Sequence, residues 1–396
     1  MGLLETDICG IPLENPFIIA SASPSATIDM IEKSFIAGWA GVVTKTVKPD
    51  NMHIEDARPR FNVVKDGKNI IGFENFELVS KKNIGYWTNG IKYLKEKYPS
   101  KVVITSIMGD SSEESWSQLA IDMEVAGSDA LELNFSCPHG MPEMGVGAAV
   151  GQNPEIIEKI TKWVKGSVSI PVIVKLTPNV TSIEQAADAG IRGGADAFAA
   201  INTVESLSGI NLETFEPLPS VNGMSTYGGL SGKAVKPIGL RAVSQIARSQ
   251  EVPIMGIGGI SNWSDAMEYM AVGASSVQVC TEVMLKGFDI VKDMITETEK
   301  FLDRKGFTSV RQVIGQAIPK LTSHESLVKN APLIAEVDTV KCIGCGKCVV
   351  ACNDGGYGAV ILVEKKAVIS KSECDGCSLC THVCPTDALE LVKIGA

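Results

Sequence analysis

The sequence has no apolar run long enough to cross a membrane, so a membrane-spanning fold is not expected. Its first residues include Glu5 and Asp7 and no basic segment, so we expect no secretory signal either. Acidic residues outnumber basic ones, and the net charge of -10 at pH 7 argues against a nucleic-acid partner. We therefore predict a cytoplasmic globular protein without a membrane partner.

Cysteine is scarce in the first 330 residues, which contain only Cys9, Cys137 and Cys280. The rest of the 11 cysteines lie between positions 342 and 384. A disulfide framework would not crowd in this way in a long chain without an export signal. We therefore expect metal ligation in a reducing compartment.

Short β-rich runs alternate with helical stretches along the first 300 residues. This order predicts an α/β fold, a (β/α)8 TIM barrel, in preference to a doubly wound open sheet without a nucleotide fingerprint. The predicted strands are residues 17–20, 41–46, 102–107, 130–135, 172–176, 197–202, 254–257 and 276–280. The predicted helices are residues 29–37, 115–126, 155–164, 182–189, 237–248, 263–271 and 287–305.

Other signals place the ends and connections of these elements. A hairpin over residues 6–15 is expected to plug one end of the barrel, and Gly38, Gly127, Gly190 and Gly273 are predicted left-handed helix caps. Two long connections, 137–153 and 203–236, are predicted functional lids on the ligand side. The predicted domains are a barrel at 1–312, a linker packed on the barrel at 313–336, and a cysteine-rich domain at 337–396.

The eight C-terminal cysteines form two runs of one spacing, C-x2-C-x2-C-x3-C. This is the pattern of a bacterial ferredoxin with two [4Fe-4S] clusters, a small α+β domain in which the fourth cysteine of each run ligates the other cluster. Zinc is the weaker alternative, because it requires no such cadence. The predicted ligands are Cys342, Cys345, Cys348 and Cys384 for one cluster, and Cys374, Cys377, Cys380 and Cys352 for the other.

The strand at 130–135 runs into a glycine-rich loop and carries the residues most suggestive of catalysis. Asn134 and Ser136 fall on one face by strand alternation, and Cys137 follows where the strand ends. In a parallel barrel that is the ligand side, where a thiol can act as a positioned proton donor. A buried core cysteine is the alternative.

An ordered set of motifs carries a family resemblance: Lys45-Thr46, Asn134-x-Ser136-Cys137-Pro138, Lys175-Leu-Thr-Pro-Asn179, Asn202-Thr203, Gly256-x-Gly258-Gly259 and Cys280-Thr281. Together they resemble the dihydroorotate dehydrogenase superfamily of FMN barrels. Tyr227-Gly-Gly-x-Ser-Gly232 and Cys352-Asn-Asp-x-Gly-Tyr357 are similar to the pyrimidine-reducing half of dihydropyrimidine dehydrogenases. The resemblance implies FMN in the barrel and two [4Fe-4S] clusters in the tail.

The resemblance also implies roles for barrel residues toward FMN. Lys45 and Lys175 would donate to the isoalloxazine edge, since a lysine in an apolar strand is rarely buried unpaired. Gly258-Gly259 and Cys280-Thr281 match the usual phosphate site of such barrels, although ordinary glycine turns are the alternative. Further FMN neighbours, implied by resemblance only, are Ala20, Ser21, Thr46, Asn134 and Gly232.

For the substrate, the resemblance implies Asn75, Asn134, Ser136, Asn202 and Thr203, with turn chemistry as an alternative for Asn75. Glu77 would repel orotate and tolerate neutral uracil or thymine. Cys137 would exchange a proton with C5 of the pyrimidine ring. The implied reaction interconverts uracil or thymine with the 5,6-dihydro compound. A dihydroorotate dehydrogenase, another cyclic-amide dehydrogenase and a non-catalytic iron–sulfur protein are the alternatives.

A dinucleotide-binding G-x-G-x-x-G is absent, because Gly256-x-Gly258-Gly259 lacks the third glycine at the required spacing. The chain is therefore not expected to bind NAD by itself. A partner subunit with FAD and an NAD(P) site is implied, so the protein is expected to be a hetero-oligomer.

Overall fold

A computed structural model describes residues 2–135, 148–329 and 331–394. The chain divides into two compact units, Met1–Leu321 and Thr322–Ala396, each considered by itself below. The division falls inside the segment predicted to be a linker. Within the described residues, no helix has the length and apolarity needed to span a membrane.

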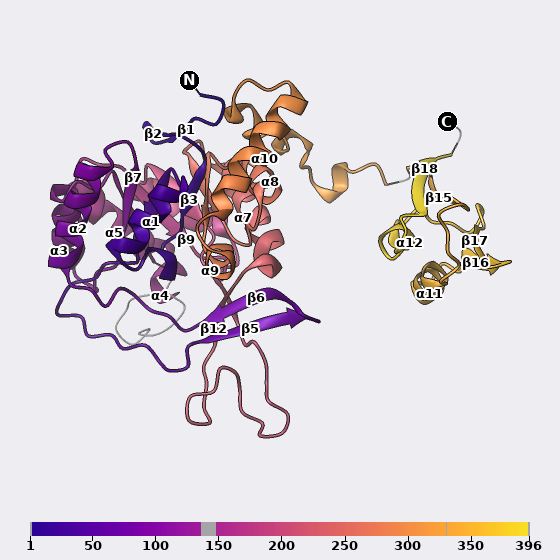
Figure 1. Cartoon of the computed structure of the whole chain (residues 1–396), viewed down its shortest axis with the longest axis horizontal. Helices are drawn as coiled ribbons and strands as arrows, with labels where there is room; N and C mark the ends of the chain where they lie inside the picture. Colours follow the sequence, from indigo (N-terminus) through magenta and orange to yellow (C-terminus); the bar gives the residue numbers. More distant parts are fainter. Residues whose placement is uncertain (1, 136–147, 330, 395–396) are drawn as a thin grey trace. The chain divides into compact units, whose positions relative to one another are not determined.

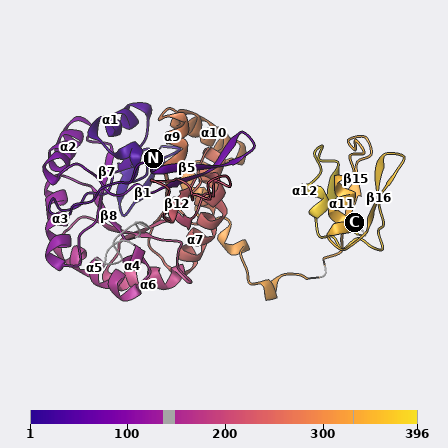
Figure 2. The same cartoon turned by 90° about the horizontal axis from the view of Figure 1, so that it is seen from below.

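Unit 1 is a closed barrel of eight parallel strands, surrounded by helices (Figures 1 and 2). Each predicted strand is present, with ends that differ by at most three residues, so the TIM-barrel prediction is confirmed. In barrel order the strands are β10 (Ala197–Ala200), β13 (Ile254–Ile257), β14 (Ser276–Val279), β3 (Phe17–Ile19), β4 (Gly41–Val43), β7 (Val102–Ile107), β8 (Ala130–Asn134) and β9 (Val172–Leu176).

The predicted helices are also present. Two helices of the ring were not predicted, the six-residue α9 and the 14-residue α2. Its centre reads Asn89-Gly90, which is a turn signal in sequence. Gly90 is there because Ile28 packs on it: an added Cβ would lie 2.2 Å from Ile28 Cδ1. The helices of the ring are α1 (Ile28–Ala37), α2 (Ile84–Lys97), α3 (Glu113–Val125), α5 (Pro154–Ser167), α6 (Ile183–Gly193), α7 (Lys236–Ser249), α8 (Trp263–Ala271), α9 (Thr281–Lys286) and α10 (Ile290–Lys305).

Helix caps follow the sequence at three positions and differ at one. Gly38, Gly127 and Gly273 have left-handed φ values of 117°, 98° and 112°. The predicted cap at Gly190 is wrong, because α6 continues to Gly193 and Gly194 takes the left-handed conformation. Gly190 is instead a packing glycine, since an added Cβ would lie 2.7 Å from Phe198 Cε1.

The amino-terminal hairpin closes one end of the barrel. It consists of β1 (Thr6–Ile8) and β2 (Ile11–Leu13). Ile8 and Leu13 are buried in one cluster with inward-facing barrel residues such as Ile104 and Ile173. This end is filled with apolar side chains, so the plug prediction is confirmed and the polar groups gather at the carboxyl ends of the strands.

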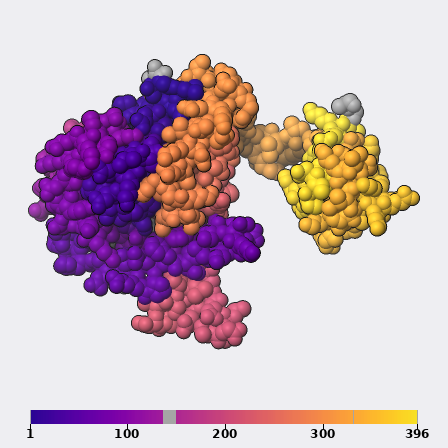
Figure 3. All heavy atoms as spheres, viewed as in Figure 1, coloured from indigo at the N-terminus to yellow at the C-terminus, as the bar shows by residue number. Residues whose placement is uncertain are grey.

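A second sheet, antiparallel and four-stranded, is formed by β5 (Phe61–Asp66), β6 (Asn69–Asn75), β11 (Val204–Ser206) and β12 (Gly228–Ser231). The predicted lid at 203–236 therefore includes two strands. Residues 207–227 form an arm between them, which projects from unit 1 in Figure 3. The other predicted lid, 137–153, lies largely outside the described residues, which resume with α4 (Ala148–Gly151).

Unit 2 is a small α+β domain with two antiparallel strand pairs. β15 (Leu333–Val337) pairs with β18 (Leu389–Lys393), and β16 (Val360–Val363) pairs with β17 (Lys366–Ile369). Two short helices, α11 (Lys347–Asp354) and α12 (Leu379–His382), complete it. Cys348, Cys352 and Cys380 are buried in its core, so the core of this unit is built around its thiols.

Candidate active site and iron–sulfur sites

A pocket of about 1130 Å³, including its open mouth, lies at the carboxyl ends of the barrel strands. The four-stranded antiparallel sheet of β5, β6, β11 and β12 contributes Phe61, Phe73 and Leu230 to the wall of this pocket. Ser136 and Cys137, the predicted proton donor, lie outside the described residues. Every other predicted site residue of the barrel lines this pocket: Ala20, Ser21, Lys45, Thr46, Asn75, Glu77, Asn134, Lys175, Asn202, Thr203, Gly232, Gly258, Gly259, Cys280 and Thr281.

Lys45 and Glu77 form an ion pair at the pocket wall. Lys45 Nζ lies 2.9 Å from Glu77 Oε2, and both side chains are mostly buried. Ser23 Oγ donates to the same oxygen at 2.5 Å, while Arg60 Nε lies 3.9 Å from Oε1. The Glu77 charge is therefore compensated by cations, and its predicted repulsion of orotate stays a prediction.

Lys175 is paired with a residue that sequence reasoning missed. Its Nζ lies 3.2 Å from Glu132 Oε1, and Gln278 Nε2 donates to Glu132 Oε2 at 2.8 Å. Glu132 is fully buried on β8, and Gln278 is buried on β14, so this chain of contacts spans the barrel interior. We expected a ligand to compensate Lys175, but a buried carboxylate also does so. The sequence signal that could have identified Glu132 is a charged residue within an otherwise apolar strand.

The Asn134 amide is positioned by Thr46. Asn134 Nδ2 donates to Thr46 Oγ1 at 2.9 Å, and that hydroxyl also contacts Ser106 Oγ at 3.0 Å and Ser21 Oγ at 3.3 Å. Asn134 pairs with Lys175 in the register of β8 and β9. The amide and the ammonium group are therefore neighbours on adjacent strands.

Two other predicted substrate ligands already have backbone partners. Asn75 Oδ1 accepts from Glu77 N at 3.1 Å, and Asn75 Nδ2 donates to Gly229 O at 3.1 Å. Asn202 Oδ1 accepts from Thr203 N at 2.8 Å. The two amide oxygens thus have turn-like contacts, whereas the Asn75 nitrogen bonds to the neighbouring strand β12. An amide group has four hydrogen-bonding positions in total, so the two contacts of Asn75 leave capacity for a ligand.

Tyr269, also missed, supports the predicted phosphate loop from behind. Its hydroxyl donates to Gly258 O at 2.7 Å and lies 3.2 Å from Ile257 O. Burial raises the pKa of the Tyr269 phenol well above its usual range. An added Cβ on Gly259, whose φ is 71°, would lie 2.8 Å from Gly232 O. Only glycine therefore allows these two backbone segments to approach so closely.

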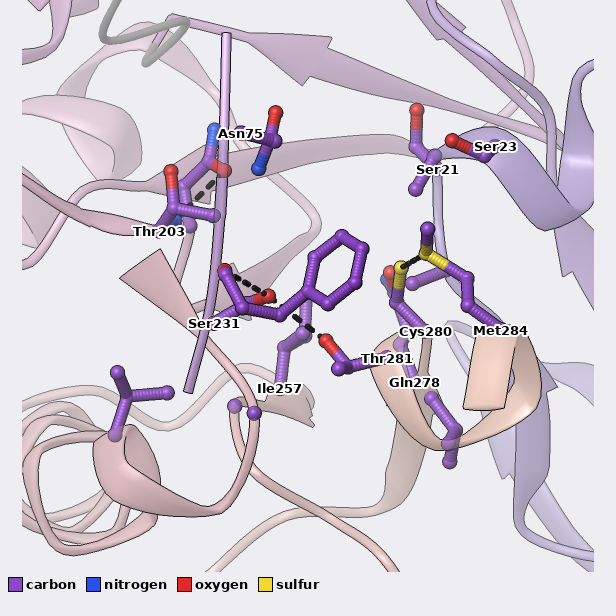
Figure 4. Close-up of a pocket in the computed structure, with 18 of the residues that line it drawn as sticks. Ser21, Ser23, Asn75, Thr203, Ser231, Ile257, Gln278, Cys280, Thr281 and Met284 are labelled. Carbon is purple, nitrogen blue, oxygen red and sulfur yellow. Dashed lines mark hydrogen bonds between the residues drawn. The ribbon is translucent and has the colours of Figure 1, made fainter. Parts of the chain in front are cut away.

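Cys280 and Thr281 lie together near Ser231 (Figure 4). Thr281 Oγ1 and Ser231 Oγ are 2.8 Å apart, and Ser231 Oγ donates to Phe73 O at 3.0 Å. Burial raises the pKa of the Cys280 thiol to about 11, with Glu77 adding to the effect and Lys45 and Lys175 opposing it. Burial therefore favours the neutral thiol form of Cys280 near pH 7.

The pocket fits a flat cofactor with a phosphate. Gln278 Oε1 is buried and has no hydrogen-bond partner among the described residues, as expected of an atom that awaits a ligand donor. Gly258 and Gly259 form a cradle that a side chain would fill. Lys45, Lys175 and Asn134 provide donors of the kind that stabilise a reduced flavin.

Unit 2 has two cavities of about 310 and 350 Å³, including solvent-open space, and each is lined by four cysteines. The first contains Cys342, Cys345, Cys348 and Cys384. The second contains Cys352, Cys374, Cys377 and Cys380. The fourth cysteine of each run thus lines the cavity of the other run, and each cavity brings together four thiols, the number that a [4Fe-4S] cluster requires.

Comparison with known families agrees with both sites. Residues 3–302 match the family described as dihydroorotate dehydrogenase, and residues 335–391 match the 4Fe-4S dicluster domain. The chain belongs to the dihydroorotate dehydrogenase family. The barrel of this family member is an FMN barrel, and its C-terminal domain carries two [4Fe-4S] clusters.

Named relatives of this family member divide into two groups. The chain is 39% identical over 397 residues (99% of this chain, 96% of the relative) to the NAD-dependent dihydropyrimidine dehydrogenase subunit PreA of Escherichia coli (strain K12). It is 36% identical over 339 residues (83% and 80%) to the chloroplastic dihydropyrimidine dehydrogenase (NADP(+)) of Arabidopsis thaliana. It is also 36% identical over 317 residues (80% and 99%) to the dihydroorotate dehydrogenase B (NAD(+)) catalytic subunit of Pyrococcus abyssi (strain GE5 / Orsay).

Proposed function

We propose that this chain is the pyrimidine-reducing subunit of a dihydropyrimidine dehydrogenase. It interconverts uracil or thymine with the 5,6-dihydro compound at FMN in the barrel pocket. The two [4Fe-4S] clusters exchange electrons with a partner subunit that binds FAD and NAD(P). The observation that carries the proposal is that one chain contains both a flavin-type pocket and two cavities lined by four cysteines each.

The extent of similarity favours a pyrimidine substrate over dihydroorotate. The archaeal dihydroorotate dehydrogenase relative is covered over 99% of its own length but matches only 80% of this chain. The bacterial dihydropyrimidine dehydrogenase subunit matches 99% of this chain, and thus also the cluster domain. An enzyme that shares both parts is the better guide to the substrate.

We assign the pocket residues two kinds of role. Lys45, Lys175 and Asn134 hold the isoalloxazine edge, while Gly258, Gly259, Cys280 and Thr281 line the phosphate site. FMN, when bound, supplies the hydride chemistry at C6 of the pyrimidine. Asn75, Asn134, Ser136, Asn202 and Thr203 bind the ring's carbonyl and N–H groups. Glu77, two residues after Asn75, places a carboxylate at the pocket wall; Lys45 and Arg60 compensate its charge, and we assign it only the part of disfavouring an anionic substrate more than a neutral side chain would.

Cys137 moves the proton in this proposal. As a thiol it donates to C5 of the pyrimidine in the direction of reduction, and as a thiolate it accepts that proton in the direction of oxidation. Cys137 lies outside the described residues; in the sequence it follows Asn134, the last residue of β8, by three positions, and a residue that follows a barrel strand is expected on the ligand side.

The nicotinamide specificity belongs to the partner. One dihydropyrimidine dehydrogenase relative is named for NAD and another for NADP(+), although both resemble this chain. We assign NAD to this enzyme from the more extensive match. We also place the complex in the reducing cytoplasm, where thiolate ligands persist.

The test is anaerobic purification together with the flavoprotein partner, followed by NADH-driven turnover of uracil and of orotate. We expect reduction of uracil and not of orotate. Reduction of orotate in its place would support the dihydroorotate dehydrogenase alternative. Material with iron but without flavin would support a non-catalytic electron carrier.

A further inference from the structure

The loops between the first three cysteines of each run in unit 2 have the same left-handed turns. Gly344 and Gly346 have φ values of 69° and 76°, and the matching positions Gly376 and Ser378 have 71° and 66°. The backbone between these cysteines is therefore similar in the two runs. A difference between the two cluster sites is to be sought in the side chains of these loops and in the hydrogen bonds to the sulfurs.

The side chains at matching positions differ in charge. Between the second and third cysteines, the first run carries exposed Lys347 and the second carries Leu379. Between the first and second cysteines, the first run carries Ile343 and the second carries exposed Asp375. The first site is thus flanked by a cation and the second by an anion.

One neighbouring group strengthens this difference. Lys366 Nζ donates to Cys342 O at 2.6 Å and so brings a second, partly buried cation to the first site. Lys341, which directly precedes Cys342, is paired with Asp338 at 3.7 Å and therefore adds no net charge to this site. Each site also has one aspartate shortly after its fourth ligand, Asp387 after Cys384 at the first site and Asp354 after Cys352 at the second, so these two carboxylates do not distinguish the sites.

Hydrogen bonds to the sulfurs act in the same direction. Ala388 N donates to Cys384 Sγ of the first site at 3.2 Å, and the Thr386 hydroxyl lies 3.7 Å from the same sulfur. At the second site, Ala335 N donates to Cys374 Sγ at 3.4 Å. A donor to a ligating sulfur stabilises the extra negative charge that a cluster gains on reduction.

We propose that the cluster held by Cys342, Cys345, Cys348 and Cys384 has the higher reduction potential of the two, and that it holds the electron when unit 2 carries only one. Nearby cations stabilise the added negative charge, whereas Asp375 destabilises it at the other cluster. This inference rests on the cluster sites and not on the proposed substrate. It assigns Lys347 and Asp375 as residues that tune the order of electron uptake.

The test is a reductive titration of the full-length, cluster-loaded protein with dithionite, followed by electron paramagnetic resonance. Wild type should show two reduction waves. Asp375→Asn should raise the lower wave and leave the upper one nearly unchanged. Lys347→Gln should lower the upper wave, whereas Lys347→Arg, which keeps the charge, should not. Lys162→Gln on α5 of the barrel removes one charge outside unit 2 and should move neither wave.

Two further readouts keep the outcome decisive. Cys352→Ser removes a ligand of the second cluster, so the wave that remains should be the upper one. Higher salt should bring the two wild-type waves closer together, because exposed charges are screened. The proposal is overturned if the wild-type waves coincide, if Asp375→Asn moves the upper wave, or if Cys352→Ser leaves the lower one. None of these readouts depends on pyrimidine turnover.

Discussion

Lys175 Nζ lies 3.2 Å from Glu132 Oε1 inside the barrel, and both side chains are almost fully shielded from solvent. Removing one partner of a buried ion pair destabilises a protein more than replacing both partners by apolar residues, because the remaining charge is left buried without a partner. The pair thus links a predicted flavin ligand to the barrel core.

We predict that Glu132→Ala lowers the free energy of unfolding by about 3–5 kcal/mol, because it leaves Lys175 buried without its carboxylate. Chemical denaturation of the flavin-free protein measures this loss. The matched control is Glu158→Ala, which breaks the exposed pair with Arg192 on the barrel surface and should cost less than about 1 kcal/mol. Equal losses for the two variants would contradict the assigned burial.

A second prediction concerns the phosphate loop. Tyr269→Phe removes the hydroxyl that donates to Gly258 O at 2.7 Å, so we expect the affinity for FMN to fall about tenfold as the loop loosens. Flavin fluorescence during titration with FMN measures the affinity. Tyr93→Phe, which changes an exposed tyrosine of α2, should leave the affinity unchanged.

The same variant has a pH signature. The pKa of Tyr269 is raised by burial, so the folded protein keeps the phenol neutral where the unfolded chain begins to ionise, near pH 10. This contribution to stability is complete below that pH and is lost as the pH rises further. The stability of Tyr269→Phe should therefore decline less steeply above about pH 10 than that of wild type.

A third prediction uses the left-handed residue Ser378, whose φ is 66°. Ser378→Gly should stabilise the cluster-loaded protein by about 1 kcal/mol, because glycine adopts this conformation without strain. The reciprocal change at the matching position, Gly346→Ser, should destabilise it by a similar amount. Anaerobic thermal unfolding measures both, and a stabilising Gly346→Ser would refute the structural equivalence of the two runs.

A fourth prediction tests which cysteines share a cluster. Cys352→Ser and Cys374→Ser should each lower the iron content from about eight to about four atoms per chain. The double variant should still hold about four, because both residues serve one cluster. Combining Cys352→Ser with Cys342→Ser should remove nearly all iron. If the first double variant lost all its iron instead, the cysteines would be paired within each run.

A fifth prediction concerns Cys137. Cys137→Ala should bind FMN and uracil but lose at least about 100-fold in turnover, because the proton donor is gone. Anaerobic steady-state kinetics with the partner subunit measure the rate, and uracil-induced changes in the flavin spectrum report binding. Cys9→Ala, outside the pocket, is the matched control. Turnover near the wild-type rate would exclude Cys137 as the acid.

The barrel could be predicted from sequence because its strands are mostly apolar and its helices alternate with them. The same expectation of apolar strands gave no role to Glu132 and Gln278. Single-sequence patterns give the identity of an inward polar residue but not its partner, and the Gln278 partner is 146 positions away in the chain. The role of Tyr269 was hidden for the same reason, since its contact with Gly258 depends on how α8 packs behind β13.

The local sequence does not predict helix α2, because tertiary packing determines that helix. Asn89-Gly90 is a turn signal by itself, yet Ile28 requires a glycine there and α2 continues through it. The iron–sulfur ligands, in contrast, follow from spacing alone, because a cluster imposes its geometry on any chain that binds it.

Cys348 and Cys352 lie one helical turn apart on α11 and face different cavities. Four residues of α-helix rise about 6 Å, and this distance changes very little as loops flex. The distance over which the two clusters exchange electrons is therefore set by one turn of rigid helix. Surface substitutions around the clusters can therefore change their reduction potentials during evolution without changing the distance between them.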